Sequence, residues 1–162
     1  MKKNYTVILL AILVISMSIT SVFSAQYSKF SRKFIKNFKD CDQYEETTSN
    51  QFQGQTFTST KKIIGWRNGF CRYQEVLSSA AGKYKVDCAF SDVQIDELYD
   101  AMRSRYKKTE TYNLELFSPQ KDEKTGKTTY VKSGSTVIKG NKAYVIWAKY
   151  QNNPYFCVPE KL

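Results

Sequence analysis

The dipeptide Asn68-Gly69 constrains the fold more than any other feature of this chain. A tight two-residue hairpin turn needs positive φ at both central positions, and Asn followed by Gly tolerates that backbone best. The residues on either side are rich in β-branched and aromatic types, which favour strands. We therefore predict two antiparallel strands with Trp66 opposite Cys71. The same register sets Ile64 opposite Tyr73.

A second turn within residues 78–82 is predicted to add a third strand. Centred between Ala80 and Ala81, it sets Tyr73 opposite Cys88. Side chains alternate between the two faces of a strand, so this register sorts the residues by chemistry. The apolar face collects Ile64, Trp66, Cys71, Tyr73, Leu77, Tyr84, Val86, Cys88 and Phe90. The other face collects Lys61, Arg67, Arg72, Gln74, Lys85 and Asp87, with Ile63 and Val76 as exceptions.

Two amphipathic helices are predicted to cover the apolar face. Ser91 and Gln94 form a capping box, which marks the start of one helix. Apolar residues then recur at helical spacing as far as Tyr106. The other helix covers residues 27–41, and its apolar arc holds Tyr27, Phe30, Phe34, Phe38 and Cys41. Its opposite arc holds Lys29, Arg32, Lys33, Lys36 and Lys39.

The C-terminal third is predicted to be rich in strands. Residues 109–117 alternate between polar and apolar types, and residues 118–127 have the composition of a loop or hairpin tip. Two further strands are predicted at 129–138 and 143–150. Their connection at Gly140-Asn141 is another two-residue hairpin signal.

These elements predict an α+β fold. An antiparallel sheet, with hairpins around Asn68-Gly69 and Gly140-Asn141, packs against the basic N-terminal helix and the second amphipathic helix. Disulfide bonds are expected to cross-link these elements. We expect one domain over residues 25–162, in which 25–106 form an α-β-β-β-α unit and 107–162 a β-rich C-terminal extension.

Residues 1–24 have the pattern of a secretory signal peptide. Two lysines precede an uncharged apolar run, and Val22-Phe23-Ser24 offers small residues where signal peptidase cuts. We predict cleavage after Ser24 and a secreted or periplasmic protein. The alternative is that the segment is retained as an N-terminal membrane anchor.

An even number of cysteines in an exported chain predicts disulfides. The chain has four, namely Cys41, Cys71, Cys88 and Cys157. Three connectivities are possible, and the sequence does not choose among them. We favour a bond from Cys41 to a sheet cysteine, because Cys41 shares the apolar arc of its helix. No metal site is predicted, since the chain has no histidine and no Cys-x-x-Cys pair.

The absence of histidine also excludes catalytic arrangements built on it. A Ser-Lys dyad or a carboxylate pair remains conceivable, but no spacing marks one. Asp92, Asp96 and Asp100 share a helix face, and an exposed helix face explains them fully. No catalytic residue and no cofactor are therefore assigned.

The formal net charge of +10 and the basic helical arc point to an anionic or protein partner. The alternative interpretation of the arc is a solvated helix face. We predict an exported, non-enzymatic binding protein of the cell envelope or extracellular space. Its partner would be an anionic envelope polymer, a lipid surface or an acidic protein, and no nucleic-acid motif is present. The alternatives are a structural envelope-associated protein and a hydrolase that works without histidine. The predicted contact residues are Lys29, Arg32, Lys33, Lys36 and Lys39.

Overall fold

The computed structural model describes residues 30–52, 55–104, 108–122 and 124–162. Its largest element is a five-stranded antiparallel sheet with strand order β1-β2-β3-β4-β7. These strands are β1 (Tyr44–Phe52), β2 (Gln55–Arg67), β3 (Phe70–Ser79), β4 (Gly82–Phe90) and β7 (Cys157–Lys161). A separate antiparallel hairpin consists of β5 (Glu110–Lys121) and β6 (Thr128–Gly140). The predicted signal peptide, residues 1–24, lies outside the described residues.

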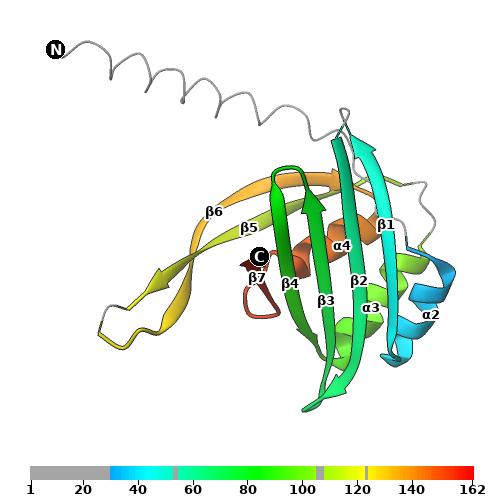
Figure 1. Ribbon diagram of the computed structural model, residues 1–162, viewed down its shortest axis with the longest axis horizontal. Helices are drawn as coiled ribbons and strands as arrows, with labels where there is room; N and C mark the ends of the chain where they lie inside the picture. Colours follow the sequence, from blue (N-terminus) through cyan, green and yellow to red (C-terminus); the bar gives the residue numbers. More distant parts are fainter. Residues whose placement is uncertain (1–29, 53–54, 105–107, 123) are drawn as a thin grey trace, which may run out of the picture.

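Three helices pack on one face of the sheet (Figure 1). They are α2 (Arg32–Asp40), α3 (Asp92–Arg103) and α4 (Lys142–Gln151). The β5–β6 hairpin passes along one end of the sheet and reaches out past β4 and β7. The fold is therefore α+β with antiparallel sheets, as the sequence predicted. The assignment of residues 25–162 to one domain stays a prediction.

Trp147 of α4 lies at the centre of the core. Its ring has neighbours from α2, from the segment just before α2 and from two strands of the sheet: Phe30, Phe34, Phe38, Tyr73 and Phe90, with ring centroids 5.0–6.4 Å away. Aromatic side chains bury large areas, and tilted or edge-on pairs add a favourable electrostatic contact. This cluster joins the C-terminal helix to the α-β-β-β-α part of the chain.

Two disulfides close the structure, Cys41–Cys71 and Cys88–Cys157. The first joins the end of α2 to β3, which confirms the predicted bond from helix to sheet. The second joins β4 to β7 and holds the C-terminal strand on the main sheet. All four cysteines are buried.

A β-bulge at Gly65 makes part of the predicted β2–β3 register wrong. Trp66 lies opposite Cys71 as predicted, but Tyr73 faces Ile63 in place of Ile64. The register shifts between Ile63 and Gly65, where Gly65 has φ +102°. A bulge inserts one unpaired residue, so every residue on its far side changes face. Lys61 consequently points into the protein, contrary to the sequence prediction.

The predicted hairpin at Gly140-Asn141 and the strand at 143–150 are also wrong. Residues 142–151 form α4, and Asn141 is its N-cap, with the side-chain oxygen accepting a hydrogen bond from Tyr144 N at 2.8 Å. Asn favours tight turns and helix N-caps equally, so the dipeptide was ambiguous. The segment is apolar all round because α4 is enclosed between the sheet, α3 and the β5–β6 hairpin.

Candidate functional site

The predicted contact surface lies on α2, whose two ends are capped. Ser31 is the N-cap, and its hydroxyl accepts a hydrogen bond from Phe34 N at 3.0 Å. The same hydroxyl donates to the carboxylate of Glu46 on β1. At the other end Cys41 adopts a left-handed conformation, and Asp42 N donates to Asn37 O at 2.9 Å. This is the usual way in which a helix satisfies its last carbonyl groups.

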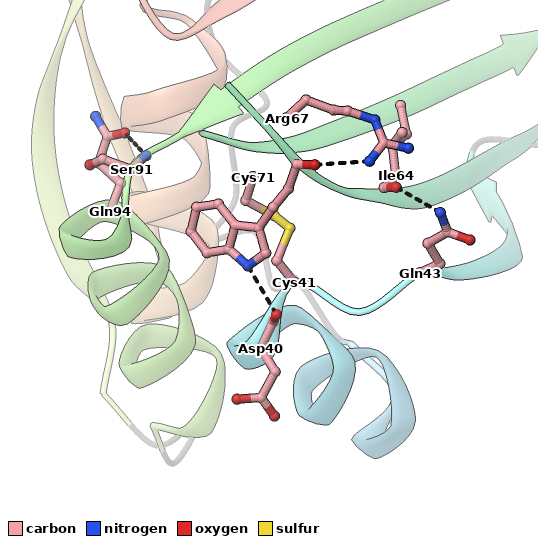
Figure 2. Close-up of a disulfide and its surroundings, with 9 residues drawn as sticks. Asp40, Cys41, Gln43, Ile64, Arg67, Cys71, Ser91 and Gln94 are labelled. Carbon is pink, nitrogen blue, oxygen red and sulfur yellow. Dashed lines mark hydrogen bonds between the residues drawn. A yellow bond between two sulfur atoms is a disulfide. The ribbon is translucent and has the colours of Figure 1, made fainter. Parts of the chain in front are cut away.

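The underside of α2 is fixed to the sheet. Phe34 and Phe38 are completely buried. Figure 2 shows how the helix end is tied to the β2–β3 hairpin by the Cys41–Cys71 disulfide. Close to the disulfide, the indole Nε1 of Trp66, the strand partner of Cys71, donates a hydrogen bond to Asp40 O at 3.2 Å. The outward face of α2 is thus presented in one defined orientation.

Four basic side chains cover that outward face. Arg32, Lys33, Lys36 and Lys39 are all exposed, whereas the fifth predicted residue, Lys29, lies outside the described part of the chain. The salt bridges found among the described residues involve other cations: Lys62, Lys85, Lys132 and Lys149. The positive charge of α2 is therefore not neutralised by an ion pair within the described structure.

Two of these cations rest on aromatic rings. Lys33 Nζ lies 5.3 Å from the ring centre of Tyr44, and Lys39 Nζ lies 5.0 Å from that of Tyr99. A cation over a ring face is attracted by the ring electrons and keeps its full charge. These contacts orient Lys33 and Lys39 without compensating them, so they remain available to an anion.

Arg103 of α3 extends the basic surface beyond the predicted residues. Its guanidinium carbon lies 5.2 Å from the ring centre of Tyr99, and Nη1 donates to the Tyr99 hydroxyl at 3.3 Å. Lys39 and Arg103 therefore share one aromatic ring, although they come from different helices. The sequence carried no signal for this pairing, because only the packing of α3 beside α2 brings the two residues together.

A buried polar row crosses the sheet beneath the helices, and sequence reasoning missed it. Glu46, Lys61 and Glu75 lie opposite one another on β1, β2 and β3. Lys61 and Glu75 are only 8% and 9% exposed. Lys61 Nζ donates a hydrogen bond to Thr48 Oγ1 at 3.4 Å, and no salt bridge among the described residues joins it to either glutamate. The two carboxylates flank its charge from the opposite positions of the neighbouring strands. The row is a consequence of the bulge at Gly65, which turns Lys61 inward.

Glu75 is the most heavily bonded member of this row. Its carboxylate accepts hydrogen bonds from Ser59 Oγ at 2.5 Å, Tyr73 Oη at 3.1 Å and Gln151 Nε2 at 2.6 Å. Burial, and then the charge of Glu75, hold the pKa of Tyr73 well above its usual value. The Tyr73 hydroxyl is therefore a fixed hydrogen-bond donor and would make a poor acid or base at neutral pH.

A second polar contact fixes α4 against α3. Tyr150 Oη donates to Glu97, and Lys149 Nζ lies 3.0 Å from Glu97 Oε1. Partial burial alone would raise the pKa of Glu97, but the hydrogen bonds from Tyr150 and Lys149 outweigh it and lower that pKa. This contact positions the two helices. Because Glu97 stays ionised at neutral pH, it has no proton to donate in a reaction.

The described residues offer little for catalysis or metal binding. Asp92, Asp96 and Asp100 are exposed on α3, and every described cysteine is in a disulfide. Within the described ranges no three residues of the types His, Cys, Asp and Glu converge as a metal site. None of the described helices has both the length and the apolar character needed to cross a membrane.

Comparisons with known proteins do not place the chain in a family. No protein-family model, no curated protein and no solved structure matches it.

Proposed function

We propose that this chain is an exported, non-enzymatic binding protein that contacts an anionic partner through the basic face of α2. The observation that carries the proposal is the contrast between the two sides of this helix. Its phenylalanines are completely buried and its end is tied down by a disulfide, while four cations face solvent without an ion pair in the described structure. Fixed, uncompensated charge attracts ligands of the opposite sign.

Export is proposed from the N-terminal sequence and from the cysteines together. Residues 1–24 have the signal-peptide pattern, and disulfides persist mainly in oxidising compartments outside the cytosol. An anionic envelope polymer is the partner class that best fits this location. A flexible polyanion can follow the basic residues along α2 and continue to Arg103 on α3.

The test uses immobilised linear polyphosphate as the probe. Arg32→Glu and Lys36→Glu are combined, because neither side chain makes an ion pair or a cation–π contact in the described structure. An acidic residue at the first turn of α2 also suits the helix dipole, so the fold should be retained. We expect retention at low salt to be weakened. The slope of log affinity against log salt concentration should decrease by about 1.4, at about 0.7 for each lost contact with a flexible polyanion.

A matched control carries the same charge change at another place. Lys124→Glu with Lys127→Glu alters two exposed lysines at the turn of the β5–β6 hairpin, far along the chain from α2. This variant should keep most of its retention and its salt dependence. Equal losses in both double variants would show that only net charge matters, and the assignment of the site to α2 would then be wrong.

A further inference from the structure

A groove lies between the β5–β6 hairpin and the helix-bearing face of the main sheet. Its volume is about 420 Å³. Its lining residues come from the hairpin, from β3, β4 and β7, and from the end of α4. Figure 1 shows the hairpin reaching out beyond β4 and β7. Binding sites for small molecules commonly have volumes of about 300–1,000 Å³ and a mostly apolar lining. The size of this groove falls within that range.

The lining of the groove is mostly apolar and contains no charged side chain. Leu77, Val86 and Pro159 of the main sheet form its floor, while Leu116, Phe117 and Tyr130 of the hairpin face them. The polar members of the lining are Gln151 and Asn152, at the end of α4. Gln151 is already bonded to Glu75, whose carboxylate has two further donors. The inner end therefore presents no free charge to a ligand.

The walls of the groove are held in place before any ligand binds. The Cys88–Cys157 disulfide fixes β7 beside β4 at the floor. Prolines at 119, 154 and 159 restrict the backbone of the lining. Phe117 makes an edge-on contact with Tyr155, with ring centres 6.2 Å apart, which links the hairpin to the segment before β7. A preformed site loses little entropy on binding.

A cation lies on β7 just beyond the lining residue Pro159. Tyr84 of β4 lies opposite Lys161 of β7, and Val86 lies opposite Pro159 in the floor. Side chains two residues apart on a strand share a face. Lys161 therefore lies on the same face as Pro159, two residues further along β7. Lys161 is exposed, and none of the salt bridges among the described residues involves it.

We infer that this groove binds an amphiphile with an apolar chain and an anionic end, of which a long-chain carboxylate is the simplest case. The chain would lie between the floor and the hairpin, where it meets no buried charge. The carboxylate would remain at the mouth beside Lys161. This site is separate from the basic face of α2, so the inference stands or falls independently of the proposed function.

The test is a titration of the folded protein with saturated carboxylates of increasing chain length, followed by isothermal calorimetry. Affinity should rise about fourfold for each added methylene until the groove is full, and should then level off. Matched alcohols should bind about two- to fivefold more weakly, since an exposed ion pair contributes little. Affinity that does not depend on chain length would overturn the inference.

Variants of exposed residues locate the binding without unfolding the protein. Leu77 and Leu116 are 44% and 37% exposed, so Leu77→Asp and Leu116→Asp place a charge in the groove at low cost to the fold. Each should weaken binding at least tenfold. Val137→Asp is the matched control, because Val137 lies on the same hairpin, is 58% exposed and is not in the lining. Equal weakening by the control would contradict the assignment.

Lys161→Gln tests the mouth of the groove. It should remove the preference for carboxylates over alcohols and leave the dependence on chain length unchanged. The alternative occupant of the groove is a second copy of the chain. Sedimentation at several protein concentrations tests this by measuring whether the protein dimerises. A dimer that Leu116→Asp disperses, together with no carboxylate binding, would assign the groove to self-association and refute the amphiphile.

Discussion

Removing the Cys41–Cys71 disulfide should destabilise the fold by an amount set mainly by the loop that it closes. The two cysteines are 30 residues apart in sequence. The chain-entropy relation for a loop of this size predicts a loss of about 3.6 kcal/mol in the free energy of unfolding at room temperature. The same relation gives about 4.4 kcal/mol for Cys88–Cys157, whose separation is 69 residues.

The assay is urea denaturation of the double variants Cys41→Ala/Cys71→Ala and Cys88→Ala/Cys157→Ala, with circular dichroism as the readout. Both variants should lose several kcal/mol, and the second should lose more. The slope of free energy against urea should increase, because a chain without the cross-link exposes more surface when unfolded. A loss below about 1 kcal/mol for the first variant would refute the argument that the bond matters by constraining the unfolded chain.

A third variant separates the cross-link from backbone strain. Cys41 has φ +56°, in the left-handed region that costs residues with a Cβ about 1–2 kcal/mol. Glycine avoids this cost but loses roughly 0.5–1 kcal/mol more backbone entropy on folding than alanine. Cys41→Gly/Cys71→Ala should therefore be more stable than the alanine pair by up to about 1.5 kcal/mol. A less stable glycine variant would show that the left-handed conformation is not what the helix end requires.

Two further predictions concern the bulge and the contact between α3 and α4. Gly65→Ala should lower the free energy of unfolding by roughly 1–3 kcal/mol, because φ is +102° at this position. Thermal melts measure the loss. The control Gly134→Ala should show no comparable loss, because an added Cβ there meets nothing within 4 Å. The folded-state pKa of Glu97 lies below its ordinary value of 4.5, so its stabilising contribution is present above that pH and is lost as the pH falls through the folded pKa. Glu97→Gln should therefore be less stable than the original protein near neutral pH, and the difference should shrink in acid unfolding curves; a constant difference down to low pH would contradict the role of the carboxylate.

The elements that the sequence predicted correctly are those set by neighbouring residues. Asn68-Gly69 forms the β2–β3 turn, with Asn68 and Gly69 both at positive φ. Ser91 and Gln94 make the predicted capping box of α3. Such signals act within a few residues, so they operate before the rest of the chain is in place. The outward direction of the basic residues of α2 follows in the same way from helical spacing.

The errors occurred where one sequence is compatible with two local structures. Gly140-Asn141 suits both a hairpin and a helix start, and Val145 and Ile146 favour a strand in isolation. Burial decides the matter, because α4 places Trp147 and Tyr150 in the core. Helix propensity differences of a few tenths of a kcal/mol per residue are small beside the burial of aromatic side chains.

From the sequence alone one could determine the α+β class, the two helices that cover the sheet, and the expectation that all four cysteines pair. Tertiary structure decided which cysteines meet, which way Lys61 points, and that Arg103 joins Lys39 at the ring of Tyr99. It also created the groove, whose walls come from β3, β4, β5, β6, β7 and the end of α4. The division has one physical cause. Turns, caps and amphipathic faces depend on residues a few positions apart, whereas contacts between distant segments depend on the packing of the whole chain.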